Sequence, residues 1–274
     1  MIDSVLLFRD ALYGALVIGI TCAILGVYVV LRQIIFVGAA LAQLSSAGIA
    51  FALWLTGLGL TAGLLTRPLT VSLAVTLLGA LFFGLGAGRR VIPADATIGV
   101  TYAVAGALGI LLIAKAVTGE AHDIFLQGNI LGLTRKDTLL ELGVSLPILL
   151  FHRVFYKEFL FVSFDQETAR TLGFKVARWN LLLYFTIGLV IAFAIQFAGV
   201  LLVFNFLVLP AVTGLLLARS MGGTFAIAAI AAAAASLVGF AFSVWFDLPS
   251  GAAIIAASGA FVAVGWVIRR VRGD

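Results

Sequence analysis

The residues best suited to bind a metal ion are few, and they fall in two places. Glu120, His122 and Asp123 are nearly contiguous, and their carboxylates and imidazole could bind a cation transiently. The alternative is that they belong to a solvated connector between two apolar segments. His152 lies beyond an intervening apolar run, so the two histidines are predicted to lie on opposite sides of a membrane and to share no static metal site. Beside Arg153, His152 is predicted to be an interfacial residue.

A second group of polar side chains interrupts apolar runs. Gln43, Ser45 and Ser46 lie close together in one run, and Asn205 lies in another. One interpretation is hydrogen bonding between helices, worth under about 1 kcal/mol for each bond. The other is that these side chains line a path for a cargo recognised by neutral hydrogen bonds. The single cysteine, Cys22, is predicted to pack as a small apolar residue without a disulfide.

Acidic residues are placed where they disfavour ion-coupled transport. Asp95, Glu141 and Asp247 are all expected near helix ends, and none falls clearly at mid-membrane. The sequence also lacks a GxxxxGK[ST] phosphate-binding loop and an HExxH metal motif. The chain is therefore predicted to be no enzyme and to hold no permanent cofactor.

The composition sets the class of protein to which these residues belong. Of 274 residues, 63% are hydrophobic and only 11% are charged, against roughly 25% charged in soluble domains. The apolar runs reach the ~20 residues that a helix needs to cross a bilayer, and no alternating barrel pattern accompanies them. We predict one all-helical transmembrane domain over 1–274 with nine crossings, or eight if one division fails. The expected ranges are 11–31, 39–57, 69–87, 96–116, 139–155, 178–197, 199–218, 223–245 and 250–268.

The basic residues predict the orientation of the chain. With a cytoplasmic C-terminus, the inner side carries most of the Lys and Arg residues, including Arg269, Arg270 and Arg272, as the positive-inside rule requires. Nine crossings would then place the N-terminus outside. The basic residues lie at helix ends without a stripe or aromatic platform, so nucleic acid is not an expected partner.

One polar segment stands out on the predicted inner side. A cytoplasmic loop over about 156–177 contains the helix-competent stretch 164–173, in which Asp165 is suited to cap a helix and Gly173 to end it. Such a segment in an otherwise membrane-embedded chain predicts contact with a soluble partner. The alternative is a solvated connector that happens to be charged.

The order of several short segments resembles the permease subunits of bacterial zinc/manganese/iron-type ABC importers over nearly the whole chain. The similar pieces are Tyr28 to Arg32 with Gly38, Ala96 to Gly99, Gln127 to Gly132, the loop with Ala169 and Gly173, Gly199 to Leu202 leading to Leu209, Pro210 and Ala211, and Leu248 to Gly251. The loop also resembles the coupling helix of cobalamin and iron-siderophore permeases.

The resemblance implies a function and a set of partners. It implies a homodimeric permease in the bacterial plasma membrane that moves a zinc, manganese or iron cation with ATP hydrolysed by a separate ABC ATPase. The ATPase would contact Phe164, Asp165, Glu167, Ala169 and Gly173, and an extracytoplasmic substrate-binding protein would dock on the outer side, where Glu120, His122 and Asp123 lie.

The sequence departs from this family at the start of the second crossing. Members that move free divalent cations have Asp and, four residues later, His, which share one helix face. Here these positions are Ala39 and Gln43, and neither is a good transition-metal ligand. The departure keeps open a metal chelate or another small polar solute as cargo. An ATP-independent channel or secondary carrier is the alternative from another class.

Overall fold

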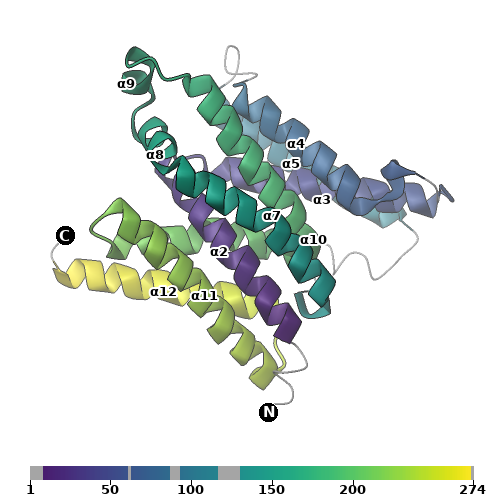
Figure 1. The fold of residues 1–274 in the computed structure, drawn as a ribbon. Helices are drawn as coiled ribbons and strands as arrows, with labels where there is room; N and C mark the ends of the chain where they lie inside the picture. Colours follow the sequence, from purple (N-terminus) through teal and green to yellow (C-terminus); the bar gives the residue numbers. More distant parts are fainter. Residues whose placement is uncertain (1–8, 61–62, 87–92, 117–129, 273–274) are drawn as a thin grey trace. The chain divides into compact units, whose positions relative to one another are not determined.

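A computed structural model describes residues 9–60, 63–86, 93–116 and 130–272, and every regular element in these ranges is helical (Figure 1). The elements are α2 (Arg9–Leu31), α3 (Ile35–Gly57), η1 (Leu64–Thr66), α4 (Pro68–Gly84), α5 (Ala94–Lys115), η2 (Ile130–Gly132), α7 (Arg135–Val154), α8 (Tyr156–Phe164), α9 (Gln166–Thr171), α10 (Val176–Leu217), α11 (Met221–Phe246) and α12 (Ser250–Arg272).

Several of these helices are suited to cross a bilayer. Within the described ranges, six helices are long and apolar enough, and the bent pair α7 and α8, which meet at 72°, makes up to seven. α4 is apolar but has only 17 residues. The prediction of a polytopic helical protein is thus confirmed, whereas the predicted count of eight or nine crossings is not.

The division predicted near residue 199 corresponds to a local break in a long helix. α10 runs for 42 residues, and Gly199 inside it has non-helical backbone angles of φ 75° and ψ 167°. Glycine adopts a positive φ without the steric penalty that a Cβ brings, so it permits this break. Pro210 lies further along the same helix.

The chain divides into two compact units, which we describe separately. Unit 1 comprises residues 1–33, 127–151 and 197–274, and unit 2 comprises residues 34–126 and 152–196. In unit 1, α11 packs against α2 and α12. A glycine allows α11 to approach α12, because a Cβ on Gly239 would overlap the backbone of Ile254. Gly26 in the same way allows α2 to approach the second part of α10, where a Cβ would overlap the carbonyl of Leu207.

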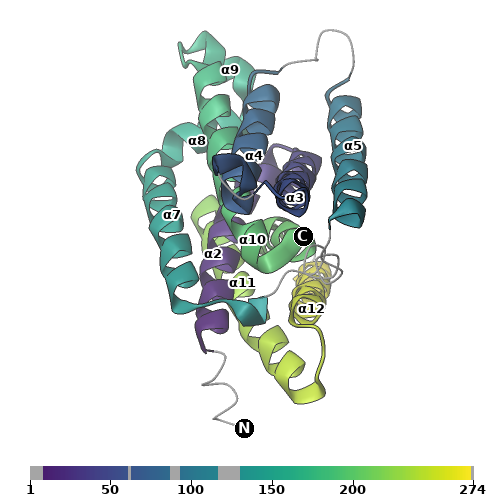
Figure 2. The same cartoon turned by 90° about the vertical axis from the view of Figure 1, so that its right-hand side faces the viewer.

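Unit 2 is built around α3, which packs against α4 and α5 (Figure 2). Ser72 of α4 approaches α3 at Gly48, where a Cβ would meet the Ser72 Cα at 2.8 Å. The first part of α10 packs on α4 in the same way, since a Cβ on Gly188 would lie 2.9 Å from that of Ala80. Small residues thus bring the backbones of these helices close together, as is typical of helices in lipid.

Candidate functional site

The segment around α9 begins with a complete N-terminal cap. Asp165 has extended backbone angles, and its Oδ1 accepts hydrogen bonds from the backbone N–H groups of Glu167 at 3.0 Å and Thr168 at 2.9 Å. Its Oδ2 accepts a bond from the Thr168 hydroxyl at 2.5 Å. The Thr168 hydroxyl, together with these backbone donors, holds the pKa of the Asp165 carboxyl below its ordinary value. The predicted cap is confirmed.

The end of α9 is equally well defined. The N–H of Phe174 donates to the carbonyl of Ala169 at 2.9 Å, and the N–H of Gly173 donates to that of Arg170 at 3.0 Å. This is the Schellman pattern, which requires a left-handed residue after the helix, and Gly173 has φ 85°. The prediction that Gly173 ends this helix is confirmed.

One face of α9 is anchored to its own unit. Ala169 is fully buried and forms a small apolar cluster with Val162 of α8 and Val176 of α10. Phe161 and Trp179 pack against the cluster, and the Phe161 and Phe174 rings meet edge to face at 5.3 Å. α9 is therefore held in a fixed place by packing, although it has only six residues.

Most of the other residues of α9 and its two ends are exposed. Phe164 and Leu172 are 61% and 66% exposed at the two ends of α9, and Asp165, Glu167 and Arg170 are exposed as well. Two exposed apolar side chains next to charged ones form the kind of surface on which another protein docks.

His152 connects the end of α7 to this anchored segment. It is only 2% exposed, and its Nε2 forms a 2.9 Å hydrogen bond with the Thr186 hydroxyl of α10. Its ring stacks on Phe159 at 4.3 Å, and Phe159 meets Trp179 edge to face at 5.2 Å. The sequence did not indicate this role, because His152 was expected to be an interfacial residue.

The polar residues of α3 differ in whether they form a hydrogen bond to another helix. Ser45 is paired with Ser72 of α4 at 2.6 Å, as the interpretation of hydrogen bonds between helices predicts. The Ser46 hydroxyl is buried and has no hydrogen-bond partner among the described residues. Gln43 is half-buried with its amide at Gly106 of α5, where a Cβ would lie 3.4 Å from the amide oxygen. Ala39, one turn earlier, is buried.

Asn205 lies in unit 1 and is described apart from the α3 residues. Its Nδ2 donates to the Ser258 hydroxyl of α12 at 3.2 Å, whereas its buried Oδ1 has no partner in the described chain. The interior of unit 1 thus holds an amide oxygen to which the described residues donate no hydrogen bond.

The residues that the sequence offers as metal ligands lie partly outside the described ranges. Glu120, His122 and Asp123 lie outside the described residues. Elsewhere in the part of the chain that the structure describes, His, Cys, Asp and Glu form no group of three or more that could hold a metal ion.

Glu141 lies further inside its helix than the sequence predicts. It was expected near the start of a helix over 139–155, but α7 begins at Arg135, so Glu141 lies about 9 Å further along the helix than that first residue. Its side chain is fully buried. Thr134 followed three residues later by Asp137 is the spacing of a helix N-terminal cap and could have indicated the longer helix, since the N–H and the hydroxyl of Thr134 both donate to Asp137 Oδ2.

Comparisons with known proteins agree with this architecture. Residues 4–268 match the family model described as the ABC 3 transport family. The chain is 30% identical over 262 residues to the manganese import system permease protein ScaB of Streptococcus gordonii, covering 95% of this chain and 90% of that protein. It is 29% identical over 266 residues to the "Probable iron transport system membrane protein" of Haemophilus influenzae, covering 96% and 94%.

A solved structure gives the same result for the fold. PsaBC from Streptococcus pneumoniae, solved in complex with a Fab, superposes with a TM-score of 0.83 and 29% identity, covering 97% of this chain and 94% of that one. By its sequence over nearly the whole length, this chain is a member of the ABC 3 transport family.

Proposed function

We propose that this chain is the translocation subunit of an ABC importer whose cargo is a transition-metal cation. The observation that carries the proposal is similarity along the whole chain to a manganese import permease and to an iron transport membrane protein. Of the zinc, manganese and iron cations that the sequence analysis considered, these relatives favour manganese and iron. Membership of an ABC transport family also favours ATP-driven import over a channel or secondary carrier.

The α9 segment supports an ABC ATPase as the cytoplasmic partner. A helix that is capped at both ends and anchored by Ala169 can transmit force, and Phe164 and Leu172 offer apolar contacts beside charged ones. The ATPase would supply the free energy, and this chain would supply a gate that its partners bias between two arrangements. A second copy of the chain would complete the path, and a substrate-binding protein would deliver the cargo at the opposite face.

The proposed topology has more crossings than the length test alone gives. The 17 residues of α4 extend about 26 Å, close to the ~30 Å of a hydrocarbon core. The 42 residues of α10 extend about 63 Å, enough for two crossings that meet at Gly199. Counting both, the chain crosses the bacterial plasma membrane nine times with a cytoplasmic C-terminus.

Ala39 and Gln43 stand where family members that move free divalent cations have Asp and His, and this difference supports a second type of cargo. An amide and a methyl group provide no strong transition-metal ligand on this face of α3. A metal chelate or another small polar solute, recognised through Gln43 and Ser46 of unit 2, would need no such ligand.

Reconstitution tests the function and the cargo together. The chain is purified in lipid with its ATPase and binding protein, and ATP-dependent uptake of Mn²⁺, Fe²⁺ and Zn²⁺ is measured in liposomes. The proposal predicts uptake of a free cation only when ATP and both partners are present. Uptake by the chain alone would favour a carrier, and uptake of a chelate but of no free cation would favour the alternative cargo.

The topology can be tested with introduced cysteines, because the cysteine that the chain already has is inaccessible. Cys22 is the single cysteine and is fully buried, so an introduced cysteine is the only one open to a membrane-impermeant reagent. Gln166→Cys should react only from the cytoplasmic side, and Asp247→Cys only from the outside. Labelling of both from the same side would contradict the proposed topology.

A further inference from the structure

The end of α12 carries a group of exposed arginines. Arg269, Arg270 and Arg272 all lie in its last turn. This part of α12 packs on the end of α10 within unit 1, since a Cβ on Gly265 would lie 3.6 Å from the Leu217 Cγ. Further along, Nη1 of Arg272 donates a hydrogen bond to the Leu217 carbonyl at 3.5 Å. This packing places the arginines beside the turn that joins α10 to α11.

A fourth arginine lies in that turn, and acidic residues do not balance the group. Arg219 follows Leu217 by two residues and is exposed. The ranges 217–223 and 250–272 contain these four arginines and no Asp or Glu. One acid, Asp274, follows Arg272 in the sequence and lies outside the described residues, so basic residues outnumber acidic ones four to one here. This end of unit 1 therefore carries an excess of positive charge.

An apolar stripe leads along α12 to the arginines. Val264, Val267 and Val271 are 54%, 53% and 82% exposed, and their spacing of three and four residues places them on one face of the helix. Trp266 is also exposed, and Cζ of Arg270 lies 5.2 Å from the centre of its ring. Tryptophan is enriched where membrane-spanning helices reach the headgroups, and a cation over its ring is attracted to it. The surface thus combines an apolar stripe with a cationic end.

A lipid with a negatively charged headgroup matches both parts of this surface. Its acyl chains suit the valine stripe, and its phosphate suits guanidinium groups, which bind phosphate oxygens through paired N–H donors. Basic pockets between membrane-spanning helices bind lipid headgroups in this way. We propose that these four arginines bind the headgroup of an anionic phospholipid such as phosphatidylglycerol. The bound lipid would join α12 to the turn between α10 and α11, whatever cargo the chain moves.

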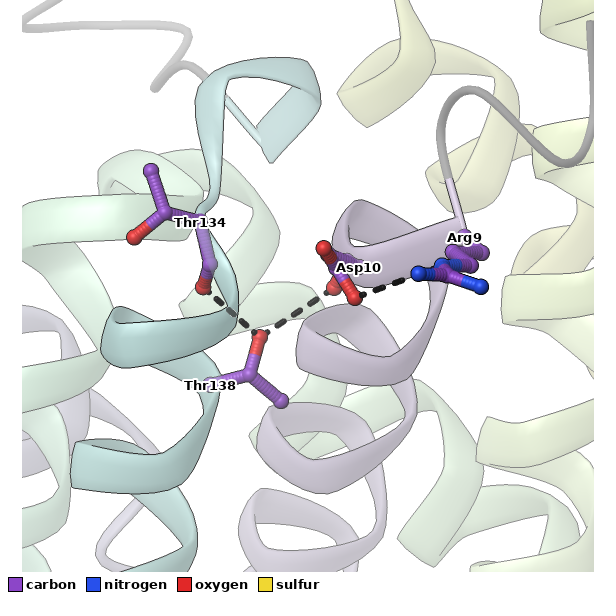
Figure 3. A network of polar contacts seen from close by, with 4 residues as sticks. All are labelled: Arg9, Asp10, Thr134 and Thr138. Carbon is purple, nitrogen blue, oxygen red and sulfur yellow. Dashed lines mark hydrogen bonds and ion pairs between the residues drawn. The ribbon is translucent and has the colours of Figure 1, made fainter.

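The starts of α2 and α7 carry basic residues of a contrasting kind. Arg9 lies 4.0 Å from the Asp10 carboxylate (Figure 3). Arg135 and Lys136 are exposed, and Asp137 follows them directly. Because acids accompany the basic residues here, a phosphate would meet negative as well as positive charge. Arg135 and Lys136 therefore provide a matched pair of adjacent charges for a control.

The test measures lipid binding to the purified chain in neutral detergent micelles. Phosphatidylglycerol with a fluorophore on its acyl chain keeps its headgroup intact, and its fluorescence anisotropy is compared with that of equally labelled phosphatidylcholine. The wild type is expected to bind phosphatidylglycerol more tightly. Arg269→Gln with Arg270→Gln should weaken this binding about 25-fold, at about fivefold for each arginine removed. Arg135→Gln with Lys136→Gln should bind as the wild type. All four side chains are exposed, so both double variants should fold.

Four results would overturn the proposal. The first is equal affinity of the wild type for both lipids, which needs no variant. The second is an equal loss in the two double variants, which would assign binding to the general charge of the protein. The third is displacement of the labelled lipid by an equal concentration of inorganic phosphate, which would show that a free anion suffices. The fourth is unchanged lipid binding in Arg269→Gln with Arg270→Gln, together with loss of the ATPase from the purified complex, which would assign the surface to that protein. The proposed function is tested separately, by ATP-dependent uptake.

Discussion

The α9 segment and the interior of unit 1 satisfy their polar groups in opposite ways. Asp165 is exposed, and the hydrogen bonds that its carboxylate accepts come from residues two or three positions along the chain. Glu141 is buried, and the hydrogen bond that Ser145 donates to its Oε1 is long, while Oε2 has no partner among the described residues. The exposed segment is thus locally complete, which suits a rigid contact with a partner. The interior carboxyl has an oxygen without a hydrogen-bond partner among the described residues, so its place depends on packing rather than on local hydrogen bonds.

The largest expected effect comes from displacing α9 from its unit. Ala169→Leu would overpack the cluster with Val162 and Val176, at a cost of about 1–3 kcal/mol. We expect ATP-dependent uptake to fall by about 5–150-fold, the factor to which 1–3 kcal/mol corresponds. ATP hydrolysis and uptake are measured side by side in proteoliposomes, and hydrolysis should continue without transport.

The control for this variant is a leucine on the exposed side of the same region. Ala177 follows Val176 but faces solvent, so Ala177→Leu adds the same side chain without overpacking. Equal losses in both variants, or normal uptake in Ala169→Leu, would mean that docking of α9 is not what couples the two activities.

A smaller effect is expected from the buried link between α7 and α10. Thr186→Val keeps the volume but removes the hydroxyl that bonds His152, at a cost of about 1–3 kcal/mol for a buried polar pair. The melting temperature of the purified complex should fall. Arg153→Gln, next to His152 but exposed, should change the free energy of unfolding by less than about 0.5 kcal/mol. If both variants have the same melting temperature, this hydrogen bond does not contribute to the stability of the fold.

The same contrast explains what the sequence could predict. The cap at Asp165 and the stop at Gly173 depend on residues within one helical turn, so their types and spacing were sufficient. The apolar ranges were also recognisable, because each must satisfy its backbone within the bilayer. The division between 197 and 199 was predicted close to the observed break at Gly199, because the apolar stretch is too long for one crossing.

Long-range pairs could not be predicted in this way. The bond between Ser45 and Ser72 joins residues 27 apart, and the link from His152 to Thr186 joins residues 34 apart. A serine or histidine in an apolar run is compatible with many partners, and only the packing of the helices selects one. Glu141 was misplaced because a polar first turn hid the start of α7, and its burial depends on neighbours in other helices.

Gly173 allows the end of α9 to be tested without changing its packing. Gly173→Ala adds a Cβ that would meet no atom within 4 Å, so its effect comes from the positive φ alone, about 1–2 kcal/mol. We expect the end of the helix to fray and uptake to fall a few-fold. Gly99→Ala in α5 also meets no atom but has no positive φ, so uptake should be unchanged. A normal Gly173→Ala variant would show that the turn is not required.

The smallest expected effect is the response of the Asp165 cap to pH. Its hydrogen bonds lower the pKa of this carboxyl in the folded protein, so the cap contributes fully above the ordinary aspartate pKa of about 3.9. The contribution is lost as the pH falls through the lowered pKa, when protonation removes the acceptor. A spin label on Gln166→Cys should gain mobility in that acidic range. Asparagine also caps helices but does not ionise, so the same label on an Asp165→Asn background should show no such transition. An identical transition on both backgrounds would assign the acid response to another group.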